Sequence, residues 1–282
     1  MSVNTFGDTP PLRRRLARHL AQLRRASKIS GTALAEMVGQ SQSTISRIEH
    51  AAQAPTVATV KRWCEAVGAD PATTAELVEL AETVSTEIIE WRHASRHGYT
   101  RLQRDMHAVE AEATAILEYS PLLLPGLLQT ADAARRIIES FGLGPTDVTQ
   151  AIAARLERQA VLLDSRKSFD YVLAEPILRW RLGPRPVMRG QLERILQVAA
   201  LPHVEMGIIP STAEMSSWPG HAFAIYEGPV PMVLVETLTT GLSVSEPDAV
   251  QMYRDTFHHL RAAAVRGSEM LRLVEEAQAA LA

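Results

Sequence analysis

The stretch from Ser41 to Glu49 concentrates side chains that could read DNA. Its sequence is Ser-Gln-Ser-Thr-Ile-Ser-Arg-Ile-Glu. Amides, hydroxyls and arginine are the groups that hydrogen-bond to base edges and phosphates in a major groove. Ile45 and Ile48 lie three residues apart, so in a helix they share a face that can point into a core. Ser41 suits the N-cap of that helix. The predicted polar face consists of Gln42, Ser43, Thr44, Ser46 and Arg47.

A second group of polar side chains could meet in the other half of the chain. Arg155, Arg158 and Gln159 lie three and four residues apart, so a helix would let all three converge on one acceptor. One interpretation is a pocket for an anionic ligand, and the other is an internal salt-bridge network with acids such as Glu175.

Two further side chains belong to the predicted ligand or partner pocket. Gln129 ends the apolar stretch Pro125-Gly126-Leu127-Leu128-Gln129-Thr130, which either lines a cleft or packs two layers together. Trp218, beside a Pro-Gly pair, could be a lid or could anchor a partner.

Motifs of the common enzyme classes are absent from the sequence. It contains no G-x-S-x-G elbow, P-loop, G-x-G-x-x-G or H-E-x-x-H. Cys64 is the only cysteine, and the spaced pair His93 and His97 has no third ligand nearby. Glu175 and Glu236 could form an acid–base pair only within a cleft. We therefore predict no enzyme, no cofactor and no metal site.

The helices that would position Ser41–Glu49 can be read from the flanking sequence. Residues 30–38 form a predicted helix with an apolar stripe, and Gly39 supplies the left-handed residue of a tight turn. Two short helices joined by a Gly turn make a helix-turn-helix, with Ser41–Glu49 as the recognition helix. Helices are also predicted at 12–27, after the cap Thr56, and from Ala72. Arg24 could pair with Glu49 inside this domain.

The remainder of the chain predicts an α+β domain, mostly helical, with a small antiparallel or mixed sheet. Helical periodicity continues over 77–97 and over 99–119. Later helices are expected at 146–163, 188–201, 249–265 and 268–281, and strands at 169–175, 204–209, 221–226 and 232–237. The predicted organisation is a disordered tail at 1–11, a DNA-binding domain at 12–80, a linker helix at 81–98 and a regulatory domain at 99–282.

Charge separates the two predicted domains. The chain carries a formal net charge of −3 over 282 residues. Residues 1–70 hold ten Lys or Arg against five Asp or Glu, so this part is basic and the remainder is acidic. Only the basic part is suited to a polyanion. With no apolar span, no secretory signal and one cysteine, a cytoplasmic location is expected.

The first part of the chain resembles the lambda-repressor-like (xenobiotic response element, XRE) family of helix-turn-helix proteins. The resemblance covers residues 12–68 and is carried by Leu34-Ala35, Gly39, the run Ser41–Glu49 and Pro55. Many relatives carry a glutamine where Gly31 stands here, so that phosphate contact is missing. The resemblance implies base and nearby backbone contacts from Gln42, Ser43, Thr44 and Arg47, and phosphate contacts from Arg25 and Lys28. It also implies a dimer on two DNA half-sites.

The second part resembles the large C-terminal domain of actinobacterial regulators of the WhiJ-like or antitoxin-like group. The matching pieces include Pro125–Thr130, Arg155 with Arg158-Gln159, and Gln191-Leu192. The resemblance implies a protein partner, commonly a small protein encoded next door. It implies no known ligand.

We therefore expect a dimeric transcriptional regulator whose C-terminal domain senses a protein or small ligand. The alternative is an antitoxin-like module that sequesters a small neighbour-encoded protein and binds DNA for autoregulation. A DNA-tethered enzyme fits least, because the motifs are missing.

Overall fold

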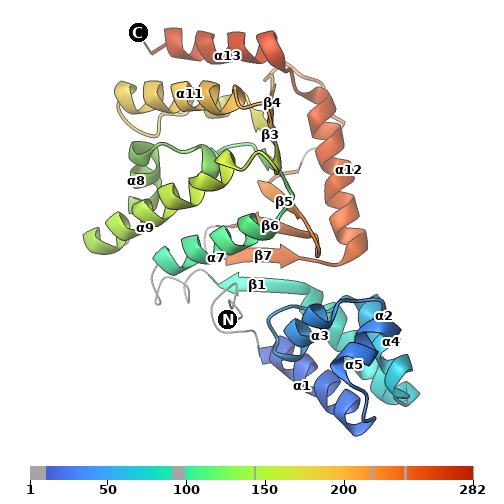
Figure 1. Ribbon diagram of the computed structural model, residues 1–282. Coiled ribbons are helices and arrows are strands. Elements are labelled where there is room, and N and C mark those ends of the chain that lie inside the picture. Colours follow the sequence, from blue (N-terminus) through green and yellow to red (C-terminus); the bar gives the residue numbers. More distant parts are fainter. Residues whose placement is uncertain (1–10, 91–98, 143, 217–218, 238–239, 282) are drawn as a thin grey trace.

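The computed structural model describes residues 11–90, 99–142, 144–216, 219–237 and 240–281. They form an α+β protein in which a small helical domain precedes a domain built on a seven-stranded sheet. In Figure 1 the helical domain is blue to cyan and lies beside one end of the sheet. Among the described helices, none is both long enough and apolar enough to cross a membrane.

Five helices make up the N-terminal domain, and the sequence explains their ends. Ser30, Ser41 and Thr56 each accept a hydrogen bond from the backbone N–H three residues on, which caps the following helix. Gly39 and Gly68 adopt φ of +67°, the left-handed conformation that closes a helix C-terminus. The helices are α1 (Pro11–Ala26), α2 (Gly31–Val38), α3 (Gln42–Glu49), α4 (Val57–Val67) and α5 (Pro71–Ser85).

An apolar core holds these five helices together. Trp63 is fully buried and packs among side chains from every helix. Ile45 and Ile48 of α3 are each 1% exposed, which confirms the predicted inward face of that helix. Cys64 is also buried in this core, and burial raises the pKa of its thiol.

The predicted linker helix is wrong over residues 86–90. Helix α5 ends at Ser85, and the chain continues as strand β1 (Thr86–Glu90), which pairs antiparallel with β7 (Thr240–Val244) at the edge of the sheet. The long-range pairing with β7 outweighs the local helical period. Residues 91–98, including His93 and His97, lie outside the described residues.

The sheet is mixed, in the order β1-β7-β6-β5-β2-β3-β4. Strands β2, β3 and β4 run parallel to one another, and the remaining neighbours are antiparallel. The further strands are β2 (Ala115–Ser120), β3 (Ser168–Ala174), β4 (Val204–Ile209), β5 (Phe223–Glu227) and β6 (Met232–Glu236). The four strands predicted at 169–175, 204–209, 221–226 and 232–237 are thereby confirmed, with shifts of up to two residues at their ends.

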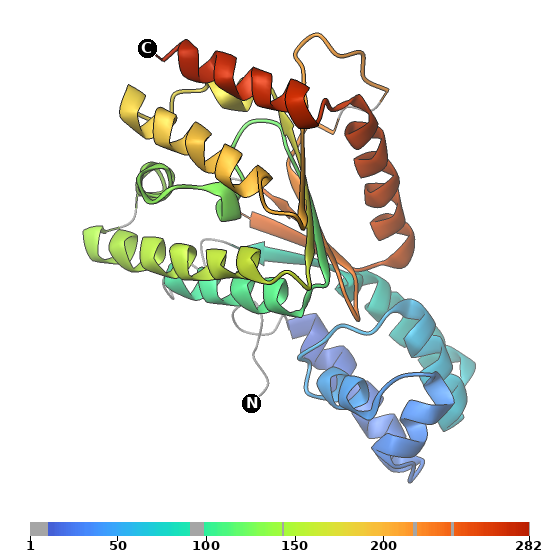
Figure 2. The same ribbon diagram turned by 45° about the horizontal axis from the view of Figure 1, so that its top comes forward.

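Helices cover both faces of the sheet. One face packs against α12 (Pro247–Ala263), with Phe257 and Leu260 buried on it. The other face is covered by a layer of helices, visible to the left of the sheet in Figures 1 and 2. This layer contains α7 (Tyr99–Glu112), η1 (Gly126–Leu128), α8 (Ala131–Glu139), α9 (Pro145–Arg158), η2 (Gln159–Leu163), α10 (Pro176–Arg179), α11 (Arg185–Ala199) and α13 (Gly267–Ala279).

The predicted helix over 99–119 is too long. Helix α7 ends at Glu112, and residues 115–120 are β2, in the interior of the sheet between β3 and β5. A central strand buried on both faces lacks the alternation that marks a half-exposed strand, so Ile116 and Leu117 continued the helical period by coincidence.

Candidate nucleic-acid interface

Helix α3 presents the predicted reading face, and Ser41 organises its first turn. The Ser41 hydroxyl accepts from the Thr44 backbone N–H at 3.1 Å and lies 2.8 Å from the hydroxyls of both Ser43 and Thr44. Ser41 therefore acts mainly as a cap that holds the next two hydroxyls in place. Its predicted role as a DNA contact stays a prediction.

The amide and hydroxyl at the start of α3 are open to solvent. Gln42 and Ser43 are exposed, while Thr44 and Ser46 are partly exposed. Gly31, at the start of α2, lies beside Gln42: a Cβ at Gly31 would stand 3.9 Å from Gln42 Nε2. The N-termini of both helices thus lie together, and the absent side chain at Gly31 leaves Gln42 room to reach a ligand.

Arg47 is the one cation of this face, and it already has a partner. Its Nη2 donates to Glu112 Oε2 at 3.2 Å, and Glu112 ends α7 in the C-terminal domain. Both side chains keep much of their surface in solvent, 41% for Arg47 and 64% for Glu112. The guanidinium is therefore near enough to the surface to be exchanged between a carboxylate and another anion.

Arg24 and Glu49 form the predicted ion pair inside the domain. Two hydrogen bonds of 2.5 and 2.8 Å join the guanidinium to the carboxylate, and Arg24 also donates to the Ile29 carbonyl oxygen at 2.9 Å. The side chains are only 15% and 10% exposed. Hydrogen bonding to Glu49 raises the pKa of the Arg24 guanidinium. This pair ties the C-terminal end of α1 to the end of α3, so it fixes the orientation of the reading face.

Arg25 and Lys28, the predicted phosphate contacts, are exposed where α1 ends. Lys28 adopts a positive φ of 57°, and its backbone N–H donates to the Arg25 carbonyl oxygen at 3.1 Å. The geometry keeps both cations on the surface of the turn between α1 and α2.

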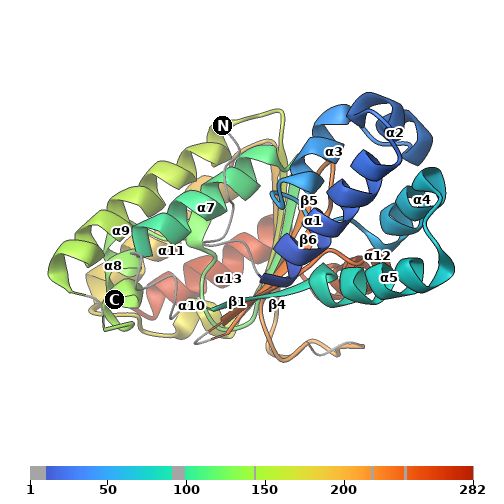
Figure 3. The same ribbon diagram turned by 90° about the horizontal axis from the view of Figure 1, so that it is seen from below.

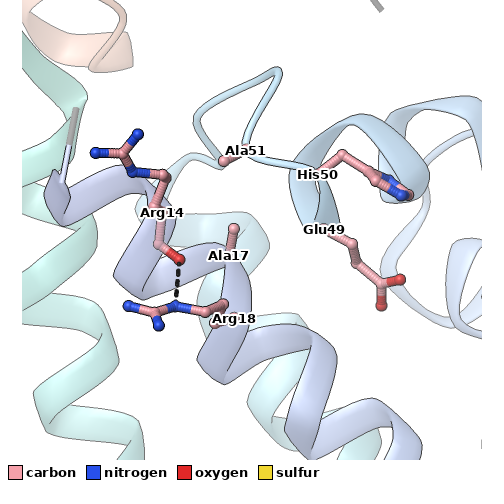
Figure 4. A pocket seen from close by; sticks show the side chains of 6 residues that line it. All are labelled: Arg14, Ala17, Arg18, Glu49, His50 and Ala51. Carbon is pink, nitrogen blue, oxygen red and sulfur yellow. Dashed lines mark hydrogen bonds between the residues drawn. The ribbon is translucent and has the colours of Figure 1, made fainter. Parts of the chain in front are cut away.

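A cationic cleft beside α3 was not predicted. It has a volume of about 430 Å³, and Arg14 and Arg18 of α1 line it opposite Glu49 and His50 (Figure 4). Because the two arginines are four residues apart, they stand on one face of α1. The sequence shows the arginines, but it gives no sign that the end of α3 would face them.

The second predicted set of side chains meets inside the C-terminal domain. Arg155 donates to Gln129 at 2.6 Å and to Gln103 at 3.1 Å, and Arg158 donates to the same Gln103 oxygen at 3.1 Å. Arg158 Nε also lies 3.2 Å from Glu110 Oε2. Both arginines are 7% exposed. Their acid partner is Glu110 of α7, whereas Glu175 bonds Arg179 and the Ser211 backbone.

Glutamines hold the loop before α8 against this network. Gln159 Nε2 donates to the carbonyl oxygens of Gly126 and Gln129, at 3.0 and 2.7 Å. Gln191 Nε2 donates to Leu128, and its Oε1 accepts from the Thr130 N–H. The separate sequence pieces at 125–130, 155–159 and 191 therefore form one internal polar unit. Whether a ligand also uses Gln129, Arg155, Arg158 or Gln159 stays a prediction.

Two known families match separate parts of the chain. Residues 103–276 match a domain of unknown function, DUF5753, and residues 15–77 match a family described as a helix-turn-helix domain. The first match covers more than half of the chain. The chain belongs to the DUF5753 family. The lambda-repressor-like resemblance of its first part is confirmed, and this part is an XRE-like helix-turn-helix of the DNA-binding type. The antitoxin-like and actinobacterial assignments stay predictions.

Similarity outside these families is limited. No curated protein matches the sequence. Among solved structures, the chain is similar to TrmBL2, an archaeal chromatin protein described as binding DNA in a novel mode, with a TM-score of 0.33 and 14% identity. The similarity covers 73% of this chain and 66% of TrmBL2, so this chain spans less than two thirds of that protein.

Two carboxyl groups in the DUF5753 domain have unusual protonation. Burial raises the pKa of Glu110 to about 7, although Arg158 and Arg155 oppose the shift. Burial, together with the nearby Glu236, raises the pKa of Glu118 to about 8. Glu118 stands on the central strand β2, directly opposite Tyr171 of β3, which packs in the core beneath α7. With its raised pKa, the partly buried Glu118 carboxyl group is largely neutral near pH 7.

Of the remaining predicted positions that the structure describes in the DUF5753 domain, only Glu236 lies near these buried carboxyl groups, and it raises the pKa of both Glu110 and Glu118. Trp218 lies outside the described residues. Glu175 follows the last residue of β3 and pairs with Arg179, whereas Glu236 is the last residue of β6. Among the described residues, no group of three or more His, Cys, Asp or Glu side chains could hold a metal ion.

Proposed function

We propose that this protein is a sequence-specific transcriptional regulator that reads a short operator with α3. The observation that carries the proposal is the solvent-exposed start of α3 in a helix-turn-helix domain, where Gln42 and Ser43 stand free of the core. An amide can pair bidentately with adenine, and an arginine can do so with guanine. Gln42 and Arg47 are thus the proposed base readers.

The backbone contacts would come from cations around this face. Arg25 and Lys28 are exposed at the end of α1, and Arg14 and Arg18 line the cleft beside α3. Phosphate contacts fix the register of a protein on DNA without reading sequence. The proposed action requires no catalytic step, and it fits a cytoplasmic protein.

Substitution of the reading residues tests the proposal. Gln42→Ala and Arg47→Ala should each weaken binding to the operator by ~1–3 kcal/mol, the usual value of a bidentate base contact. Arg15→Ala is the matched control, because Arg15 is an exposed arginine of the same domain whose guanidinium bonds Glu76 on α5. The operator would be selected from genomic fragments, and affinities would be measured by fluorescence anisotropy. Equal losses in all three variants would refute the assignment of α3.

The C-terminal domain would supply dimerisation and signal sensing. Its acidic charge makes it unsuited to DNA, and its internal network of Arg155, Arg158 and Gln129 is rigidly held. We propose that a small ligand or a protein partner acts on this domain.

A second candidate function, sequestration of a small partner protein, is favoured by exposed apolar side chains. Leu122 and Leu123 follow β2, and Trp180 follows α10 after the neighbouring parallel strand β3. They are 53%, 43% and 55% exposed. Isolation of the tagged full chain from its own cells, with mass spectrometry of bound proteins, would test this function. A genuine partner should be lost from Trp180→Ser but retained by Met252→Ser, which changes another exposed apolar residue.

A further inference from the structure

The recognition helix is in contact with the protein's own acidic domain. Arg47 of α3 bonds Glu112, the last residue of α7, at 3.2 Å. The views in Figures 1 and 3 agree that α3 lies on the side of the DNA-binding domain that faces α7 and the sheet. The contact therefore engages the one cation among the proposed base readers.

A groove of about 190 Å³ continues this contact between the two domains. From the DNA-binding domain it is lined by Thr44 of α3 and by Gln53 and Thr56 of the loop that follows α3. From the C-terminal domain it is lined by Val230 of the β5–β6 turn and by Pro247 and Arg254 of α12. Arg254 is held there by two bonds of 2.6 Å to Glu227.

DNA bound to α3 would compete with the C-terminal domain for the side of the helix that carries Arg47 and Thr44. A duplex that receives Arg47 and Thr44 would bring its phosphates to where Glu112 and the β5–β6 turn now lie. Glu112 would then face another negative charge, and the turn would occupy part of the path of the duplex. Both effects oppose DNA binding in this arrangement.

We propose that this arrangement is autoinhibited: Glu112 takes the place of DNA on Arg47, and the β5–β6 turn obstructs the side of α3 that carries Thr44. The inference rests on the proposed function, because it requires that α3 reads DNA. The two domains must separate before the operator binds, and a signal received by the C-terminal domain could act by changing that separation.

The Arg47–Glu112 ion pair, which we call the latch, is weak enough to be opened. An exposed ion pair contributes little to stability, and both partners here are well exposed. A shallow closed state lowers the apparent affinity for DNA by the fraction of molecules that are open. Modest changes at the interface should therefore change DNA affinity by a few-fold.

Two full-length variants test the latch by different means. Glu112→Gln removes the anion that holds Arg47, and Val230→Trp places a bulky side chain in the groove without changing any charge. Their controls are Glu139→Gln, an exposed acid on α8, and Leu163→Trp, at the 75% exposed last residue of η2. Affinity for a fluorescein-labelled mixed-sequence 30-base-pair duplex would be measured by anisotropy at low salt.

We expect Glu112→Gln and Val230→Trp to bind the duplex about two- to five-fold more tightly than wild type, with both controls unchanged. In an Arg47→Ala background, the gain from Glu112→Gln should shrink to the part that comes from repulsion between Glu112 and DNA, because Glu112 would have no cation to hold. A gain of the same size there would mean that repulsion alone accounts for the effect, and it would overturn autoinhibition through Arg47.

Different results would overturn autoinhibition and the DNA-reading function. Wild-type affinity in both Glu112→Gln and Val230→Trp, together with weaker binding by Arg47→Ala, would overturn autoinhibition and leave the DNA-reading function standing. Affinity that does not depend on Arg47 in the wild type or in Val230→Trp would overturn the DNA-reading function itself, and autoinhibition with it.

Discussion

Two ion pairs of the N-terminal domain differ in how far their side chains are buried. Arg24 and Glu49 are largely buried and doubly hydrogen-bonded, whereas Arg15 and Glu76 form one bond at the surface with about half of each side chain exposed. The sequence offers both arginines on the same helix without distinguishing them. Only the pair with Glu49 was anticipated, because it joins two helices of a recognisable domain.

Removal of Arg24 should therefore destabilise the DNA-binding domain. The Glu49 side chain is only 10% exposed in the pair, and Arg24→Ala removes the two donors of its carboxylate. The free energy of unfolding should therefore fall by about 1–3 kcal/mol. Arg15→Ala should cost about 0–1 kcal/mol, because its pair is exposed. Urea unfolding followed by circular dichroism measures both, and equal costs would contradict a structural role for the buried pair.

Protonation at Glu118 should make stability depend on pH. The folded-state pKa of about 8 is above the ordinary value of 4.5, so the fold binds this proton more tightly than the unfolded chain does. The stabilisation is complete below pH 4.5 and is lost as the pH rises toward 8. Glu118→Gln removes this dependence.

Between pH 6 and 8.5, wild type should therefore lose stability relative to Glu118→Gln, by about 2–3 kcal/mol. Glu110 is present in both proteins, so the difference between them reports Glu118 together with its electrostatic interaction with Glu110. Melting temperatures of wild type, Glu118→Gln and the surface control Glu139→Gln across this range give the answer. Parallel curves for wild type and Glu118→Gln would show that Glu118 is charged in the fold.

Elements were predictable where local signals were complete. The N-terminal helices carry their own caps, such as Ser30 and Ser41, and their own stop at Gly39, so their ends can be read directly. Strands β1 and β2 carry no such signals. Strand β1 pairs with β7, and β2 pairs with β3 and β5. These partners lie far along the chain, so the local spacing of apolar residues does not reveal the pairing.

The candidate site shows the same division. The reading face of α3 follows from the helical period of Ile45 and Ile48. Glu112 and the β5–β6 turn could not be assigned to it, because their approach depends on how the domains meet. Likewise Gln103 and Glu110, the partners of the buried arginines, belong to a helix whose packing the sequence does not specify.

The loop before α8 depends on a glycine that cannot be replaced without movement. A Cβ at Gly126 would collide with the Arg158 guanidinium, whereas a Cβ at Gly190 inside α11 would meet nothing within 4 Å. Gly126→Ala should therefore destabilise the protein by about 1–3 kcal/mol, as overpacking does. Gly190→Ala should stabilise it by about 0.5–1 kcal/mol, since alanine favours a helix interior. Thermal unfolding of the two variants should shift in opposite directions, and a common direction would contradict the close packing of Arg158 on this loop.

At the scale of the whole molecule, the chain joins a basic DNA-binding domain to an acidic C-terminal domain. One copy offers DNA only a single short recognition helix. Eight residues of α3 reach few base pairs, so specific binding needs a second copy. The proposed dimer predicts a particle of twice the 31.0 kDa chain mass in solution. It also predicts an operator with two inverted half-sites about 10 base pairs apart from centre to centre. Light scattering measures the particle mass, and footprinting on selected genomic fragments measures the spacing of the half-sites.

Insertion of about 5 base pairs between the half-sites should abolish tight binding, because it turns the second site to the opposite side of the duplex. Insertion of a full turn should restore part of that binding. Equal affinity for all spacings would mean that each copy binds alone, and the acidic domain would then have no part in operator choice.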